Sequence, residues 1–171
     1  MSNSVGISEN DFKLGMRELA AAVNIITTTY KGKKEGLTAT AACAVSAEPP
    51  QLLVCVNSEA RGHDLIKITK KFALNILRRD QENIANRFAG MDGADRTERF
   101  NLGSWSEITT GAPCLDGAIV NFDCEVIQQI SAGTHSIFIG HIIGCRNENS
   151  GASPLMYSKG EFTGLVNHES R

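Results

Sequence analysis

The sequence predicts a mostly β protein whose strands form a barrel, with a few helices at its flanks. Short apolar segments with alternating side chains recur along the chain, separated by turns. Two of them, residues 117–130 and 134–145, are long and stand a short turn apart, as paired antiparallel strands do. Strands at regular spacing with few helices between them favour a barrel over a sheet of β-α-β units.

Composition limits the classes of function. The 171 residues suit one domain, with a core at about residues 12–164 and flexible termini. A net charge of -2 provides no basic surface of the kind that nucleic-acid binding requires. We find no signal-peptide pattern and no apolar run of about 18 residues, so we expect no membrane association and a cytoplasmic location. The odd number of cysteines, with no CxxC pair, predicts buried, reduced thiols.

The first third of the chain predicts a helix followed by strands. Ser8 and Asp11 have the spacing of a capping box, and apolar residues then recur at helical intervals as far as Val23. Residues 24–30 are β-branched and aromatic, and residues 36–46 alternate, so the two segments predict a hairpin around a lysine-rich turn. The Pro49-Pro50 corner then precedes a third strand.

The next segments alternate between helix and strand. Residues 58–71 predict a crossover helix, and residues 71–77 predict a short apolar strand. Residues 81–90 predict a second helix that ends at Gly90, because glycine is a favourable residue after the last turn. Residues 91–100 are polar and predict a mobile surface loop, and residues 154–165 predict one or two short strands.

Residues 36–57 predict the wall of a ligand site. On the strand from Gly36 to Ser46, one face would carry Thr38, Thr40 and Ser46 beside alanines, since strand side chains alternate. Small residues let a flat ligand approach the backbone, whose polar groups can then bind its edges. An ordinary core strand that uses alanine for close packing has the same pattern.

The histidines predict no metal site. His135 and His141 would lie about 20 Å apart along one strand, and His63 is expected to cap or pack near a helix. His135 follows Gly133 and Thr134 at the start of a strand, where its ring could face a ligand. A packed core histidine is equally compatible with this position.

Four segments together resemble the short-chain flavin reductases. These segments are GLTATAACAVSAEPPQLLVCVN, LAAAVNIITT, FAG followed by ERF, and GTHSIFIGHI, and they occur in the family's order over residues 12–164. The reductase components of two-component 4-hydroxyphenylacetate 3-monooxygenases are similar in particular, and the uracil-catabolic flavin reductases share FDC and GTH. The resemblance implies a homodimeric, Greek-key split β-barrel of the FMN-binding type. It also implies FMN or FAD as the flavin, NADH or possibly NADPH as the reductant, and transfer of reduced flavin to a separate monooxygenase.

The same resemblance assigns site residues. The residues implied at the flavin ring are Thr38, Ala39, Thr40, Ala41, Ala42, Cys43 and Ser46. Asn57, Ser58 and Arg61 are implied at the ribityl phosphate, where a cation at a helix start suits an anion. A surface arginine is the alternative reading of Arg61.

The reductant side is also assigned by resemblance. His135 is implied as the residue that contacts the nicotinamide nucleotide, and Phe88 as a border of its pocket. The implied closing segment consists of Tyr157, Ser158, Lys159 and Gly160. Two other functions stay open besides a flavin reductase: a flavin-tethered enzyme with another acceptor, and a non-catalytic flavin-binding module.

Overall fold

The structure, a computed structural model, describes residues 6–149 and 151–165. The expected flexible ends lie largely outside these ranges. In the described part the helices are α1 (Glu9–Arg17), α2 (Arg61–Thr69) and α3 (Glu82–Ala89), with the 3-10 helices η1 (Arg79–Gln81) and η2 (Arg96–Asn101). The strands are β1 (Ala21–Ala22), β2 (Asn24–Tyr30), β3 (Lys33–Ala39), β4 (Ala42–Ala47), β5 (Pro50–Asn57), β6 (Lys71–Ile76), β7 (Trp105–Ser106), β8 (Cys114–Leu115), β9 (Val120–Ala132), β10 (His135–Arg146), β11 (Leu155–Ser158) and β12 (Glu161–Gly164).

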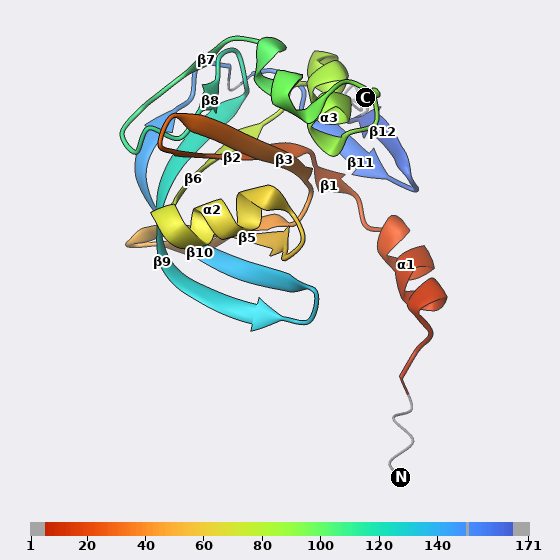
Figure 1. Cartoon of the computed structure of the whole chain (residues 1–171). Coiled ribbons are helices and arrows are strands. Elements are labelled where there is room, and N and C mark those ends of the chain that lie inside the picture. Colours follow the sequence, from red (N-terminus) through yellow and green to blue (C-terminus); the bar gives the residue numbers. More distant parts are fainter. Residues whose placement is uncertain (1–5, 150, 166–171) are drawn as a thin grey trace.

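An antiparallel seven-stranded sheet in the order β3-β2-β6-β9-β10-β5-β4 forms the body (Figure 1). Its two edge strands, β3 and β4, are consecutive in the chain and are joined only by Thr40 and Ala41. Because two residues span a short distance, the sheet must curl until its edges meet. The short connection between β3 and β4 therefore closes the barrel, although these two strands are not paired by hydrogen bonds. The prediction of a mostly β split barrel is confirmed.

Two apolar cores lie on opposite sides of β2. Ile25 packs with α3, through Ala85 and Phe88, whereas the next residue, Ile26, packs with Phe72 and Phe138. Alternate residues of a strand point to opposite faces, so one strand serves both cores. The helix α2 packs across β2, β3 and β6 and adds Ile66 to the second core.

The N-terminal helix begins as predicted and ends earlier. The hydroxyl of Ser8 accepts a hydrogen bond from the N–H of Asp11, but α1 stops at Arg17. Val23, expected to continue the helical stripe, is instead buried beside the sheet, where its N–H donates to the carbonyl of Leu155. In Figure 1, α1 stands away from the β body. None of its residues is buried.

The single strand predicted over residues 36–46 is wrong. It is divided between β3 and β4, which lie at opposite edges of the sheet. At the break, the N–H of Ala42 donates to the carbonyl of Thr40, and the carbonyl of Ala41 accepts from the N–H of Cys55. The change of hydrogen-bond partner from β2 to β5 ends the regular alternation of faces.

The later elements follow the sequence prediction more closely. α2, β6 and the β9/β10 hairpin form where expected, and α3 ends at Gly90, whose φ is 75°. The segment predicted as a loop contains η2, which is capped by Asp95 and joined to β3 by an ion pair between Arg96 and Glu35.

The cysteines are all free, but the prediction that they are buried holds for only part of the set. Cys114 and Cys124 are buried, whereas Cys43 and Cys145 are exposed. Burial, with a smaller contribution from Asp123, raises the pKa of Cys114 to about 12. Cys43 is exposed because β4 is an edge strand and no further strand pairs with its free side.

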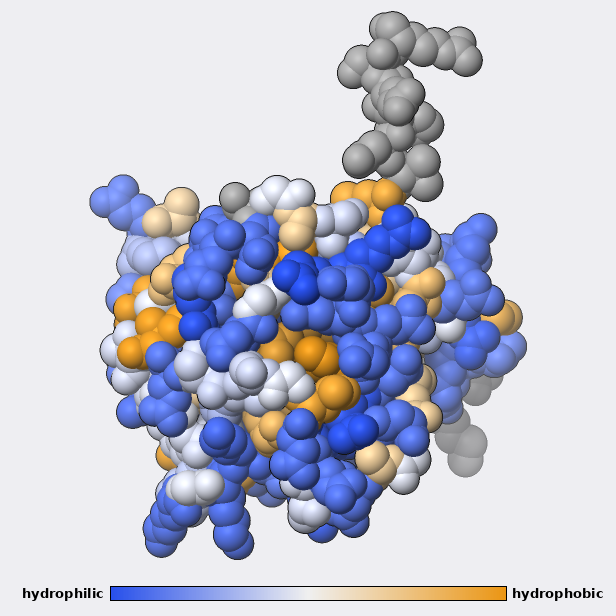
Figure 2. All heavy atoms as spheres, turned by 90° about the horizontal axis from the view of Figure 1, so that it is seen from above, coloured by the Kyte–Doolittle hydropathy of each residue, from blue (hydrophilic) through white to orange (hydrophobic). Residues whose placement is uncertain are grey.

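Hydrophilic residues cover most of the end of the molecule that carries β7, β8 and α3, with an apolar area near its centre (Figure 2). No helix within residues 6–149 and 151–165 is long and apolar enough to cross a bilayer.

Candidate functional site

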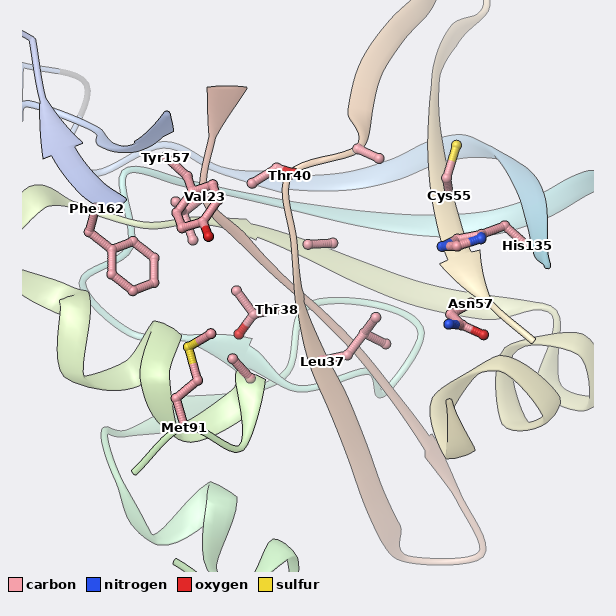
Figure 3. Close-up of a pocket in the computed structure, with 13 residues that line it drawn as sticks. Val23, Leu37, Thr38, Thr40, Cys55, Asn57, Met91, His135, Tyr157 and Phe162 are labelled. Atoms are coloured by element: carbon pink, nitrogen blue, oxygen red, sulfur yellow. The ribbon is translucent and has the colours of Figure 1, made fainter. Parts of the chain in front are cut away.

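A cavity of about 340 Å³ opens where the barrel is split (Figure 3). Its volume lies in the range of small-molecule sites. The residues that line it are Val23, Leu37, Thr38, Ala39, Thr40, Ala41, Cys55, Asn57, Ala89, Met91, His135, Tyr157 and Phe162. In Figure 3 the end of β3 lies between an apolar side, with Tyr157 and Phe162, and a polar side, with Asn57 and His135.

The wall between β3 and β4 presents hydrogen-bond donors. The carbonyls of Ala39, Thr40 and Ala41 accept hydrogen bonds from Asn24, Ala42 and Cys55, respectively. Within the described residues, the N–H groups of Thr40 and Ala41 have no partner. Both residues are exposed at the cavity, so these donors are available to the acceptor atoms of a ligand.

The hydroxyl of Thr38 has a structural partner. Its Oγ1 donates to the carbonyl of Ala85 at 2.7 Å and thereby joins β3 to α3. Thr38 therefore keeps only acceptor capacity toward the cavity. The donors that this wall can offer to a ligand are therefore backbone N–H groups.

The polar side of the cavity comes from two paired strand ends. Asn57 ends β5 and is the register partner of His135, which begins β10. The Oδ1 of Asn57 accepts from the N–H of Glu59, so its side-chain NH₂ is directed elsewhere. The Nδ1 of His135 lies 2.9 Å from the hydroxyl of Thr134, and its ring is exposed at the cavity.

The start of α2 follows this strand end directly. Its cap position is Ala60, whose side chain cannot accept a hydrogen bond, so α2 lacks a side-chain cap. Ser58 donates its N–H to the carbonyl of Thr134, which holds the turn against β10. Arg61 is the exposed first residue of the helix and does not line the cavity. An uncapped helix start next to a cation attracts an anion.

Only Tyr157 of the implied closing segment reaches the cavity. Its ring packs edge-on against Phe162, with centroids 5.4 Å apart. Lys159 and Gly160 form the turn between β11 and β12, with φ values of 55° and 87°, and Ser158 precedes them. The N–H of Lys159 donates to the carbonyl of Arg17, so this turn anchors the end of α1.

The structure places four other implied residues away from this cavity. Phe88 is 1% exposed and packs against Phe100 and Trp105, behind the wall that Ala89 and Met91 form. The remaining three, Ala42, Cys43 and Ser46, line a second cavity of about 440 Å³, which shares Thr40 with the first.

Sequence reasoning did not identify six residues of the lining: Val23, Leu37, Cys55, Ala89, Met91 and Phe162. Most are apolar residues that any core also uses, so no local signal separates them. Burial raises the pKa of the Cys55 thiol, and nearby Cys43 adds to the rise. A protonated thiol is a poor nucleophile, which argues against covalent chemistry at Cys55.

The cavity fits a flavin in three respects. Small residues and free N–H groups face the flat, acceptor-rich edge that such a ring carries, and the aromatic side can cover a ring face. The uncapped start of α2 with Arg61 suits a phosphate. The fold and site thus define an antiparallel split barrel with a cavity suited to a planar, anionic cofactor.

Comparison with known proteins agrees with this class. Residues 16–165 match the model of the flavin reductase like domain, and the chain belongs to this family. The chain is 38% identical to the FMN reductase (NADH) RutF of Stutzerimonas stutzeri strain A1501, over 95% of this chain and 91% of the relative. It is 41% identical to the FMN reductase (NADH) RutF of Pseudomonas syringae pv. syringae strain B728a, over 88% of this chain and 83% of the relative.

The fold of flavin reductase PheA2 in its native state is also similar, with 29% identity, a TM-score of 0.85, and 94% of this chain and 100% of that chain covered.

Proposed function

We propose that this protein oxidises NADH and reduces FMN, and that it releases the reduced flavin to a separate oxygenase component. The observation that carries the proposal is the pair of N–H donors at Thr40 and Ala41, which have no partner among residues 6–149 and 151–165 and stand in a cavity open to solvent. Support comes from the relatives named FMN reductase (NADH). Further support comes from BorF, the flavin reductase component of a bacterial two-component tryptophan halogenase. BorF is 28% identical, with a TM-score of 0.84 over 94% of this chain and 100% of that chain. When both are bound, the nicotinamide supplies a hydride that the flavin accepts.

The roles of the residues follow from their positions. Thr40 and Ala41 donate to the acceptor edge of the ring, and Arg61 with the start of α2 holds the phosphate. His135 orients the nicotinamide from the polar side, and Tyr157 limits water from the apolar side. Flavin exchange is expected because Arg61 is the one cation we assign to the phosphate. The proposal places the protein in the cytoplasm, where NADH is available.

Consumption of NADH with and without added FMN tests this function. Turnover should require FMN, and the flavin should be reduced in amounts that exceed the protein. Turnover that needs a third acceptor would indicate a flavin-tethered enzyme. No turnover together with tight flavin binding would indicate a non-catalytic module.

The active form is proposed to be a homodimer. Phe12, Met16 and Leu19 are 55%, 48% and 61% exposed along one side of α1 and its extension. The edge strand β4 also exposes Val45, next to the second cavity. Exposed apolar side chains of this kind favour association with another surface. A second copy would cover α1 and the open edge of β4 at once.

Sedimentation at micromolar concentration tests the dimer. Phe12→Asp with Met16→Asp should shift the protein toward a monomer and reduce its activity in parallel. Lys13→Asp, a charge change on the same helix, is the matched control. A wild-type protein that sediments as an active monomer would contradict the dimer and leave the reductase proposal standing.

A further inference from the structure

A buried hydrogen bond joins the first turn of α2 to β10. His63 is the third residue of α2 and is 6% exposed, and its Nε2 lies 2.9 Å from the Oγ of Ser136. Ser136 is 3% exposed and immediately follows His135. The bond therefore connects the helix that begins with Arg61 to the strand that carries His135.

The neighbouring side chains show which atom donates in the hydrogen bond between His63 and Ser136. The Nδ1 of His63 lies 3.1 Å from a carboxylate oxygen of Asp64, which can only accept when ionised. Nδ1 then carries the hydrogen, and Nε2 accepts from the hydroxyl of Ser136. The side-chain NH₂ of Gln129 donates to the same hydroxyl at 3.3 Å. Each of the four side chains Gln129, Ser136, His63 and Asp64 is thus bonded to the next.

The start of α2 is held at two points. A Cβ at Gly62 would lie 3.2 Å from a methyl of Leu37, so the helix lies tight against β3 at this residue. His63 holds the next residue of the helix to β10. With both contacts made, the first turn cannot rotate about its axis without breaking one of them, and the backbone of Arg61 with its N–H keeps a fixed direction.

Packing alone does not require an imidazole here. The ring of His63 lies 5.5 Å from that of Phe138, in a contact that a phenyl ring could also make. What the imidazole adds is a directional bond, which fixes orientation where apolar packing fixes only volume.

We propose that His63 is a positioning residue for the flavin phosphate: through Ser136 it holds the first turn of α2 in the direction that Arg61 and the helix start need. The proposal rests on the proposed function, because it concerns the phosphate end of the same site. It predicts that breaking the bond affects a flavin with a phosphate and spares one without.

Flavin fluorescence quenching measures this difference. Wild-type protein should bind FMN more tightly than riboflavin. Ser136→Ala should weaken FMN binding about tenfold and riboflavin binding by less than about twofold. Gln129→Ala is the matched control, since it removes a bond to the same hydroxyl without touching α2, and it should leave the FMN to riboflavin ratio unchanged.

A double variant separates positioning from stability. His63→Phe with Ser136→Ala replaces both partners of the buried bond by apolar groups, so neither is left unpaired, and only the half-buried NH₂ of Gln129 loses an acceptor. The melting temperature of the double variant should therefore stay near that of the Gln129→Ala control. The loss of FMN preference should persist in the double variant. Retention of the wild-type ratio in the double variant, or an equal loss in Gln129→Ala, would overturn the positioning role. A wild type without any preference for FMN, and without FMN-dependent NADH oxidation, would instead overturn the proposed function.

Discussion

Backbone N–H groups are paired with a carboxylate at Asp123 but have no partner among the described residues in the Thr40–Ala41 segment. The carboxylate of Asp123 is fully buried and accepts hydrogen bonds from the N–H groups of Thr109 and Thr110 and from the hydroxyl of Thr110. At Thr40 and Ala41 the carbonyls are paired, while the N–H groups have no partner in the described residues. The first arrangement stabilises a loop, and the second leaves binding capacity for a ligand. Substitutions at the two sites should therefore separate stability from binding.

The largest effect is expected at Asp123. Asp123→Ala leaves the N–H groups of Thr109 and Thr110 and the hydroxyl of Thr110 without their acceptor, and it should lower the free energy of unfolding by about 3 to 4 kcal/mol. Asp123→Asn keeps one carbonyl oxygen as acceptor and should cost less. Urea denaturation measures both. If the two variants lose the same stability, the hydrogen bonds to this carboxylate are not what stabilises the loop.

A smaller effect, confined to binding, is expected at Arg61. Arg61→Ala should weaken FMN binding by about 1.5 to 3 kcal/mol, the loss of one charge-assisted hydrogen bond, and leave riboflavin binding unchanged. Lys67→Ala removes an exposed cation from the last turn of the same helix and serves as the control. Equal weakening of both flavins in titrations would show that Arg61 does not contact the phosphate.

The elements that could be predicted from the sequence are those with local signals. The strand pair β9/β10, α2 and the Gly90 end of α3 were predictable, because alternation, helical spacing and a terminal glycine are local signals. The break at Thr40 and Ala41 was not. The alternating small residues continue through it without glycine or proline, and only the meeting of two distant sheet edges interrupts the strand.

Most residues that line the cavity could not be predicted from local sequence signals either. Asn57 and His135 were implied by resemblance and are brought together by strand register. Met91 and Phe162 reach the cavity from segments far apart in the chain, and nothing local distinguishes them from core residues. Phe88, implied at the pocket, packs behind it because Gly36 leaves room for its ring: a Cβ there would lie 2.7 Å from it.

The smallest effect, and the sharpest division between binding and stability, is expected at His135. Its ring is exposed at the cavity and its nearest polar partner, Thr134, is also exposed, so His135→Ala should change the free energy of unfolding by less than about 0.5 kcal/mol.

If the ring contacts the nicotinamide nucleotide, the same variant should lower kcat/KM for NADH about tenfold while FMN affinity stays constant, since the lost contact forms only in the complex with the reductant. The matched control is His141→Ala, on the same strand but outside the cavity lining, which should leave NADH kinetics unchanged. A stopped-flow reductive half-reaction, measured beside a thermal melt, provides both quantities. A destabilised His135→Ala variant with wild-type NADH kinetics, after correction for the folded fraction, would assign this histidine to the packing of the β9/β10 turn and remove it from the site.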